Sequence, residues 1–370
     1  MRKTYRFPCL LIGVLLGITV AAADTFESLA ARAAEALKQK DAKQAVALYR
    51  QALALRPSWA EGWFSLGAGW YELGEYHQAK TAFERASGLA PNKGAVWAFL
   101  GLAEYQMGDY RAALAHFKKG EKVGLPDDLA FVSSIHNCAA IACLHFHDFT
   151  GAVEQLRPLA RLGDQSAITI ENFGVTVLGL PYLPAQVPAS KQRLVQLAGQ
   201  AEWDICSGTD AAPVFEQLLS SYPNQAGVHY LHGIYLLDHN PEAARAEFER
   251  ELQISPLHAL ARLQIAILDI RGGDAAKAIP LAEAALKLEP QNALAHAVLG
   301  RAYMDLGEFA KAIPELKTSA QLAPENPQLH LYLGQAYRHL GRTQEADKEM
   351  AEFVRLKKSA ETGSGDVANY

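Results

Sequence analysis

The sequence predicts an all-α protein built as an α-solenoid, in which antiparallel helix pairs stack one after another. Two kinds of recurrence support this fold class. Small residues recur inside helical stretches at a spacing of 34, as Gly300 and Gly334 do, each after a leucine. Prolines keep the same period at Pro256, Pro290 and Pro324. A repeat of this length indicates units that bury their apolar faces against neighbouring units and not in one central core.

Residues 293–326 show one unit clearly. A first helix is expected at about 293–306 and a second at about 310–322, joined by a short turn. Pro324 follows the second helix, where a residue that cannot continue the backbone hydrogen bonds commonly stands. The unit is therefore predicted to be a hairpin of two helices.

Gly300 lies inside the first of these predicted helices, where glycine costs about 1 kcal/mol relative to alanine. A residue without a side chain lets a paired helix approach closely, and the packing gained can offset that cost. We therefore expect Gly300 to lie against the second helix, in which Ala312 provides another small contact.

The same phase describes most of the chain. Each unit carries apolar and small residues in its first half, and an alanine, an aromatic or apolar residue and often a proline in its second half. Units in this phase begin at residues 26, 60, 94, 225, 259, 293 and 327. Two further stretches, 128–163 and 192–225, hold the phase less well.

This pattern resembles the tetratricopeptide repeat family, whose 34-residue unit has a Trp–Leu–Gly–Tyr…Ala…Phe…Pro signature. Trp70 and Glu104 depart from it at the tyrosine position, and His232 replaces the small residue. The resemblance covers about 26–163 and 192–360, and it implies a right-handed superhelix of about eight to nine units, of an exported bacterial type. The matching residues of one unit are Trp63, Leu66, Gly67, Ala79, Phe83 and Pro91.

The first 23 residues have the layout of a secretory signal. Three basic residues precede an apolar stretch at 8–23, whose 16 residues are short for a spanning helix, which needs ~20. Cleavage after Ala23 leaves 32 Lys+Arg against 40 Asp+Glu, a formal charge of −8. We expect a periplasmic or secreted protein with no membrane insertion after cleavage; a retained N-terminal membrane anchor is the alternative. The acidic balance argues against nucleic-acid partners.

The segment 164–191 interrupts the repeats. Residues 165–180 are expected to form a helix whose partner is missing, and Pro181, Pro184 and Pro188 then predict an extended linker. The polar end of the chain lacks a periodic apolar face and is expected to be disordered. The predicted division is a signal peptide at 1–23, an N-terminal repeat block at 24–163, the interruption at 164–191, a C-terminal repeat block at 192–358 and a disordered tail at 359–370.

Catalytic signatures are lacking in the sequence, which has no HExxH, Walker loop, CxxC pair or GxSxG. His229 and His232 lie three residues apart on a predicted helix and are able to face one metal ion, but no third ligand is evident. His296 and His330 recur 34 residues apart, which favours packing between neighbouring units. We therefore expect no enzymatic activity, no cofactor and no metal. The alternative is an enzyme or ligand-binding protein with an unrecognised site near 164–224.

Three cysteines follow the predicted signal, at Cys138, Cys143 and Cys206. An odd number leaves at least one thiol outside any disulfide within the chain. Cysteine also behaves as a small buried hydrophobe, and this is the role that we expect for all three.

The function expected from the resemblance is a non-catalytic scaffold that binds proteins or peptides on a concave face lined by the first helices. Relatives that clamp the carboxylate tails of chaperones use lysine and asparagine on these helices. Glu61, Phe64, Ser65 and Ala68 stand in the early units here, so that activity is not expected.

An apolar and aromatic groove for an extended or helical peptide is expected instead, with Tyr71 and Tyr105 as amphipathic anchors. The alternative is that these side chains pack against their own second helices, or line a groove that binds nothing. The predicted lining residues are Phe64, Tyr71, Leu102 and Tyr105, with Ala68 and Ala98, in the early units, and Leu263, Ile267, Arg301, Met304, Gln335 and Arg338 in the late units.

Overall fold

The computed structural model describes the backbone of residues 25–364 and the side chains of residues 25–359. Within these residues it holds 19 α-helices, one short 3-10 helix and no strand, so the all-α prediction is confirmed. The predicted signal peptide at 1–23 lies outside the described residues. Two compact units divide the chain, and the boundary between them falls between Asp127 and Asp128. None of the described helices combines the length and the apolar character needed to cross a membrane.

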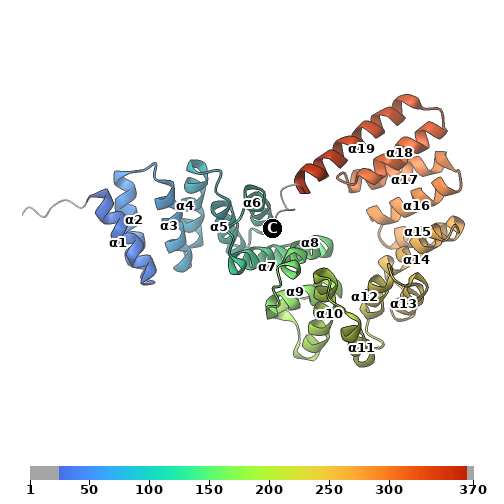
Figure 1. Ribbon diagram of the computed structural model, residues 1–370, viewed down its shortest axis with the longest axis horizontal. Helices are drawn as coiled ribbons and strands as arrows, with labels where there is room; N and C mark the ends of the chain where they lie inside the picture. The colour runs from blue at the N-terminus through green and yellow to red at the C-terminus, as the bar shows by residue number, and fades with distance from the viewer. Residues whose placement is uncertain (1–24, 365–370) are drawn as a thin grey trace, which may run out of the picture. The chain divides into compact units, whose positions relative to one another are not determined.

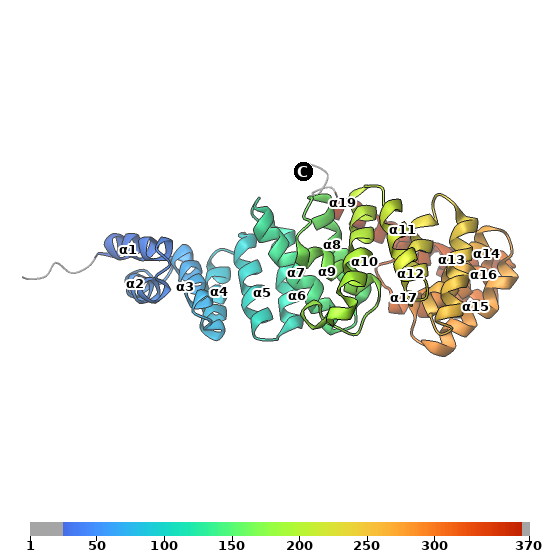
Figure 2. The same ribbon diagram turned by 90° about the horizontal axis from the view of Figure 1, so that it is seen from below.

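The first unit consists of three antiparallel helix pairs, α1/α2, α3/α4 and α5/α6, which stack in chain order (Figure 2). Within this unit α2 also packs against α3, and α4 packs against α5. The helices are α1 (Phe26–Lys38), α2 (Ala42–Leu55), α3 (Ala60–Glu72), α4 (Tyr76–Leu89), α5 (Gly94–Gln106) and α6 (Tyr110–Val123).

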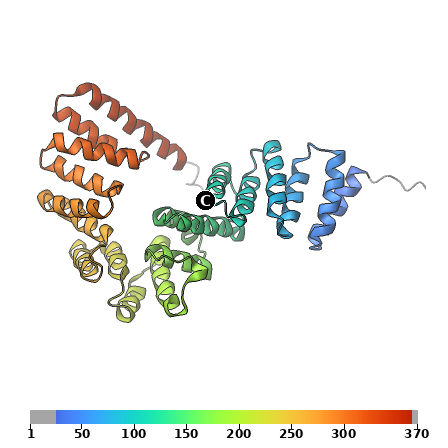
Figure 3. The ribbon, with the colours of Figure 1, turned by 180° about the vertical axis from the view of Figure 1, so that it is seen from behind.

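The second unit continues with the pairs α7/α8, α9/α10, α12/α13, α14/α15, α16/α17 and α18/α19 (Figure 1). The last pair lies side by side at the red end of the ribbon (Figure 3). The elements are α7 (Leu129–His145), α8 (Phe149–Arg161), α9 (Ala167–Val177), η1 (Pro184–Gln186), α10 (Ala189–Ser207), α11 (Ala212–Ser221), α12 (Val228–Leu236), α13 (Pro241–Ile254), α14 (Ala259–Arg271), α15 (Ala275–Leu288), α16 (Ala293–Asp305), α17 (Phe309–Leu322), α18 (Pro327–His339) and α19 (Thr343–Ser364).

Polar side chains start many of these helices by accepting a hydrogen bond from a backbone N–H of the first turn. Asp109, for example, accepts from the Ala112 N–H, 3.3 Å away, at the start of α6. Such a cap stabilises a helix by about 1 kcal/mol. The other side-chain caps come from Thr25, Asp41, Asp128, Asp148, Asn240, His258, Asn292 and Asn326.

The turn inside most helix pairs contains a residue with positive φ, although the turn between α12 and α13 does not. Gly74 has φ 76° after α3, and its N–H donates to the carbonyl of Tyr71. Lys40, 34 residues earlier, takes the same place with φ 58°, and His147 has φ 56° after α7. Side chains with a Cβ are disfavoured in this region by about 1–2 kcal/mol, so these two turns are strained relative to those with glycine.

Gly300 makes the close contact that the sequence predicts. A Cβ at this position would lie 2.7 Å from Leu316 Cγ and 3.3 Å from the Leu316 backbone nitrogen on α17. Ala312, on the same helix, is fully buried. The glycine therefore sets the spacing of the α16/α17 pair.

The prediction that the helix at 165–180 lacks a partner is wrong, because α9 packs along α10. A Cβ at Gly174 would lie 1.9 Å from the carbonyl oxygen of Val195, and a Cβ at Gly199 would lie 1.9 Å from that of Ile170. These two glycines, one on each helix, let the backbones touch. Helix α10 is therefore the second helix of a pair, and α11 packs beside it only lightly.

Helix α19 is longer than the sequence predicts. It continues to Ser364, whereas disorder was expected from residue 359. Lysine, alanine and glutamate, which favour helices, follow Leu356, and no proline interrupts them. Residues 365–370 lie outside the described part, and the predicted division into two repeat blocks stays a prediction.

Candidate functional site

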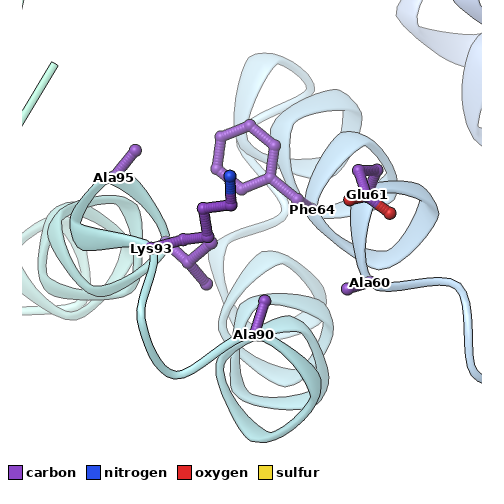
Figure 4. Close-up of a pocket in the computed structure, with 7 residues that line it drawn as sticks. Ala60, Glu61, Phe64, Ala90, Lys93 and Ala95 are labelled. Carbon is purple, nitrogen blue, oxygen red and sulfur yellow. The ribbon is translucent and has the colours of Figure 1, made fainter.

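An apolar pocket of about 230 Å³ opens in the first unit between the N-terminal halves of α3 and α5 (Figure 4). It reaches the end of α4 and the short loop that leads into α5. Small side chains leave its space open, and one phenylalanine forms its main apolar wall. The lining residues are Ala60, Glu61, Phe64, Ala90, Lys93, Ala95 and Val96.

The Phe64 ring is held in place by two other phenylalanines. Its centroid lies 5.2 Å from that of Phe99, edge to face, and 5.7 Å from that of Phe83. Phe83 is fully buried in the helix stack. Aromatic contacts of this kind stabilise beyond the area they bury, by about 0.5–1.5 kcal/mol. The pocket wall is therefore packed against aromatic rings on the side away from the pocket.

Two opposite charges stand at the rim of this pocket. Figure 4 shows Lys93 extending beside the Phe64 ring, with Glu61 on the other side. Both side chains are exposed, and neither forms an ion pair with another described residue. The pocket thus combines an apolar interior with a cation and an anion that are able to contact the polar parts of a ligand.

Phe64 is the one predicted residue that lines this pocket. Tyr71 and Tyr105 instead form edge-to-face pairs with Tyr76 and Tyr110, at centroid distances of 5.3 and 5.4 Å. The Tyr71 hydroxyl also accepts a hydrogen bond from Gln106, 3.3 Å away.

Leu102 is 8% exposed and fills the core. In the late units Leu263 is fully buried, so its expected place on an accessible face is wrong. Ile267 and Met304 are partly buried and pack against clusters that are shared between neighbouring helix pairs. These side chains face neighbouring helices, which cover them. They therefore contribute to helix packing.

The predicted polar residues of the late units are accessible. Arg301 Nε lies 2.9 Å from Asp305, and the Arg301 guanidinium lies 4.8 Å from the centroid of the Tyr332 ring. Gln335 and Arg338 are exposed.

Sequence reasoning missed Lys93 and Ala95 as pocket residues, although the signal was available. Glu61 and Ala95 stand 34 residues apart, at the same place in two successive units. Positions three residues apart on a helix share a face, so Glu61 faces the same side as Phe64. The repeat period and the shared helix face together indicate that the lining extends toward the N-terminal ends of α3 and α5.

The histidines of the second unit bridge helices through carboxylates. His229 Nδ1 lies 2.5 Å and His232 Nδ1 3.2 Å from the two oxygens of Glu247 on α13. His229 Nε2 also contacts the Pro223 carbonyl oxygen, 2.9 Å away. In the described residues no group of three or more histidine, cysteine, aspartate or glutamate side chains is placed to hold a metal ion.

His296 and His330 repeat this arrangement, with Glu315 and Glu349 at 2.6 and 2.7 Å. Each pair connects the first and second helix of one unit. The two histidines therefore bridge the helices of their own pairs, and His296 Nε2 also contacts the carbonyl oxygen of Pro290 in the preceding unit, 3.1 Å away.

Asp164 lies at the centre of a polar network in the region of the alternative site. Its carboxylate accepts hydrogen bonds from the Ser133 hydroxyl at 2.5 Å, the Thr169 hydroxyl at 2.7 Å and the Ser166 N–H at 2.9 Å. Burial raises the pKa of Asp164, but these hydrogen bonds outweigh it and lower that pKa below its usual value. A carboxylate saturated with donors joins α7 to α9 and is a poor general base.

The three cysteines are free. Burial raises the pKa of Cys138, Cys143 and Cys206 to about 11 in each case. The Cys206 thiol contacts the buried Glu202 carboxylate, which disfavours a thiolate further. None of the three thiols has the lowered pKa that an activated nucleophile needs.

Comparison with known proteins identifies repeats in both units. The family model described as "Tetratricopeptide repeat" matches residues 69–122, 263–327 and 298–355. No curated protein matches the sequence.

Solved structures with a similar arrangement include MamA from Desulfovibrio magneticus RS-1, 20% identical, with 45% of this chain and 96% of that chain covered and a TM-score of 0.41. The Cut9–Hcn1 hetero-tetramer of the APC/C is 17% identical, with 90% of this chain and 79% of that chain covered and a TM-score of 0.37. Because both TM-scores lie below 0.5, these likenesses carry no conclusion about function.

Proposed function

Because the chain is a tetratricopeptide repeat protein, we propose that it is a scaffold that holds a protein or peptide partner and catalyses no reaction. Repeat arrays present extended surfaces built from many successive helices. The observation that supports binding most directly is the preformed apolar pocket at Phe64, with free charges at its rim. Pockets of this composition, mostly apolar with a few polar groups, are typical of binding sites.

The proposed ligand is an extended or helical peptide that inserts one apolar side chain between α3 and α5. The Phe64 ring contacts that side chain, and Lys93 and Glu61 contact polar groups on either side of it. Tyr71 and Tyr105 continue the surface as amphipathic contacts. In the second unit, Gln335 and Arg338 are exposed and offer polar contacts to a protein partner.

We also propose that the protein acts outside the cytoplasm, as the basic and apolar start of the chain indicates. Cleavage after Ala23 gives a mature protein that begins at Asp24. N-terminal sequencing of the exported fraction tests this directly. Intact Met1 in the membrane fraction favours an anchor, and intact Met1 in the cytosol contradicts export.

Binding at the pocket is tested by filling it. Linear peptides are selected on the immobilised protein from a displayed random library, and the affinity of the best peptide is measured by fluorescence anisotropy. Ala95→Trp places an indole into the pocket while leaving the Phe64 cluster intact, and we expect it to weaken binding at least tenfold. The matched control is Ala115→Trp, at an exposed position of α6.

The proposal is contradicted if Ala95→Trp binds the selected peptide as tightly as the wild-type protein does. A library that yields no binding peptide contradicts it as well. Circular dichroism of both tryptophan variants establishes that the helix stack is retained.

A further inference from the structure

A second pocket, of about 380 Å³, lies in the second unit among α9, α10 and α11. Helices α9 and α10 are fixed against each other at Gly174 and Gly199, whereas α11 buries chiefly Phe215 and Leu218 and packs lightly. The space between them is as large as a typical small-ligand site of about 300–1,000 Å³. Its lining residues are Ala167, Ile170, Glu171, Arg193, Gln196, Leu197, Gln200, Val214 and Gln217.

This pocket contains two opposite charges that no described residue neutralises. Glu171, on α9, has neither a hydrogen bond nor an ion pair with any described residue. Arg193, on α10, makes a single long hydrogen bond, from Nη2 to the Gln217 side-chain oxygen at 3.4 Å. A carboxylate and a guanidinium in one pocket, not paired with each other, are complementary to a ligand that carries both an ammonium and a carboxylate group.

The register of the two helices sets the offset between the backbone positions that carry these charges. Contact of Gly174 with Val195 and of Gly199 with Ile170 makes α9 and α10 antiparallel and places Glu171 level with Ala198. Arg193 is five residues away, or about 7.5 Å along the axis at 1.5 Å per residue. A free α-amino acid carries its two charges on one carbon and is too short for this offset. An extended peptide gains about 3.3–3.6 Å per residue, so two or three residues span it.

We propose that this pocket binds a short peptide of two or three residues by its free termini. The ammonium group pairs with Glu171 and the terminal carboxylate pairs with Arg193. The side-chain amides of Gln196 and Gln217 are hydrogen-bond partners for the peptide backbone. Ile170, Leu197 and Val214 supply the apolar walls for its side chains. The site shares no residue with the pocket at Phe64, so it does not rest on the function proposed above.

Isothermal titration calorimetry with defined peptides tests this assignment. The probes are an equimolar library of tripeptides, tri-alanine, N-acetyl-tri-alanine, tri-alanine amide and free alanine. We expect the library and tri-alanine to bind, each blocked form to bind at least tenfold more weakly, and free alanine not to bind measurably. Absence of binding by the tripeptide library, or equally tight binding of free alanine, overturns the proposal.

Two substitutions assign the termini to their partners. In Glu171→Gln, acetylation of the peptide should cost no further affinity, because the ammonium has already lost its partner. In Arg193→Gln, amidation of the peptide should likewise cost no further affinity, because the terminal carboxylate has already lost its partner. Glu216→Gln on α11 and Arg161→Gln on α8 are the matched controls, since both side chains are exposed and outside the pocket. If Glu171→Gln and Arg193→Gln bind tri-alanine with wild-type affinity, the site is elsewhere.

Discussion

Glu104 and Asp269 occupy the same place in two regions of the molecule. Each lies on the first helix of a pair, at the position where the repeat signature has tyrosine, and each is almost fully buried, with 1% and 6% exposure. Each pairs with a basic residue 24 positions earlier on the preceding second helix. Lys80 Nζ is 2.9 Å from Glu104, and Arg245 Nη2 is 2.5 Å from Asp269.

The two pairs differ in what else surrounds the carboxylate. His116 Nδ1, on α6, lies 2.6 Å from the second oxygen of Glu104, and its ring stacks on Trp97. For Asp269, Arg245 is the one ion-pair partner among the described residues. The repeat backbone thus decides where the carboxylate is buried, and side chains of the neighbouring helices decide how many cations share it.

The largest effect is expected when Asp269 loses its cation. Arg245→Met should cost about 3–5 kcal/mol of local stability, because an uncompensated charge is left buried. Lys80→Met should cost less, since His116 remains beside Glu104. Hydrogen exchange of the α14 and α5 amides measures the two losses separately. Lys277→Met, which breaks an exposed pair with Asp274, is the control; equal losses in Arg245→Met and Lys80→Met contradict the comparison.

The second-largest effect is expected from a substitution at the contact between the two helices of one pair. Gly300→Leu inserts a side chain where Leu316 already stands, and overpacking of this kind costs about 1–3 kcal/mol. Gly88→Leu is the matched control, because a Cβ at Gly88 meets nothing within 4 Å. Thermal unfolding followed by circular dichroism should show a lower midpoint for Gly300→Leu alone. An unchanged midpoint refutes the packing role of Gly300.

The stability that the Glu104 carboxylate contributes should depend on pH. Burial raises the pKa of Glu104, but hydrogen bonds from His116 and Lys80 more than offset this and lower that pKa below its usual value of 4.5. A carboxyl group with a lowered pKa stabilises the folded state above pH 4.5, and this stabilisation is lost as the pH falls through the lowered value.

Glu104→Gln should therefore be less stable than wild type at pH 7, by about 1.5 kcal/mol, the lower end for a hydrogen bond to a charged group. The gap should close in acid, below pH 4.5. Exchange rates of the α5 amides at several pH values measure the gap. A gap that stays constant down to the acid transition contradicts the role of the carboxylate.

The smallest effect concerns the turn inside the pair. Lys40→Gly removes a Cβ from a residue with φ 58° and should raise stability by about 0.5–1 kcal/mol, after allowance for the greater freedom of glycine in the unfolded chain. Gly74→Lys is the reverse change at the equivalent position and should lower stability. If both variants unfold like the wild type in urea, the turn is not strained.

Local features of the fold could be predicted closely. The helices expected at 293–306 and 310–322 correspond to α16 and α17, which begin and end within one residue of those bounds. Helix propensity, capping residues and the proline after each unit are properties of neighbouring residues in the chain. They therefore appear in the sequence wherever the repeat occurs.

The candidate sites were less predictable, because they depend on residues from several helices. Phe64 was expected to be accessible and lines a pocket, yet Leu263 was expected at an equivalent face and is fully buried. The period gives the direction of a side chain on its helix, but the bulk of the neighbouring side chains decides whether space remains. Small residues leave that space beside Phe64, whereas Leu263 lies in a buried cluster that also contains the bulky side chains of Val298 and Leu299.

The sequence by itself determined the 34-residue unit, the helical hairpin and the close approach at Gly300, since each follows from the order of residues within one repeat. The tertiary structure alone decided that α10 pairs with α9, and that Glu171 and Arg193 share a pocket without pairing with each other. Pairing across the proline-rich linker depends on Gly174 and Gly199 meeting backbone atoms of the opposite helix. That fit exists only when both helices are present, so no spacing along the chain reveals it.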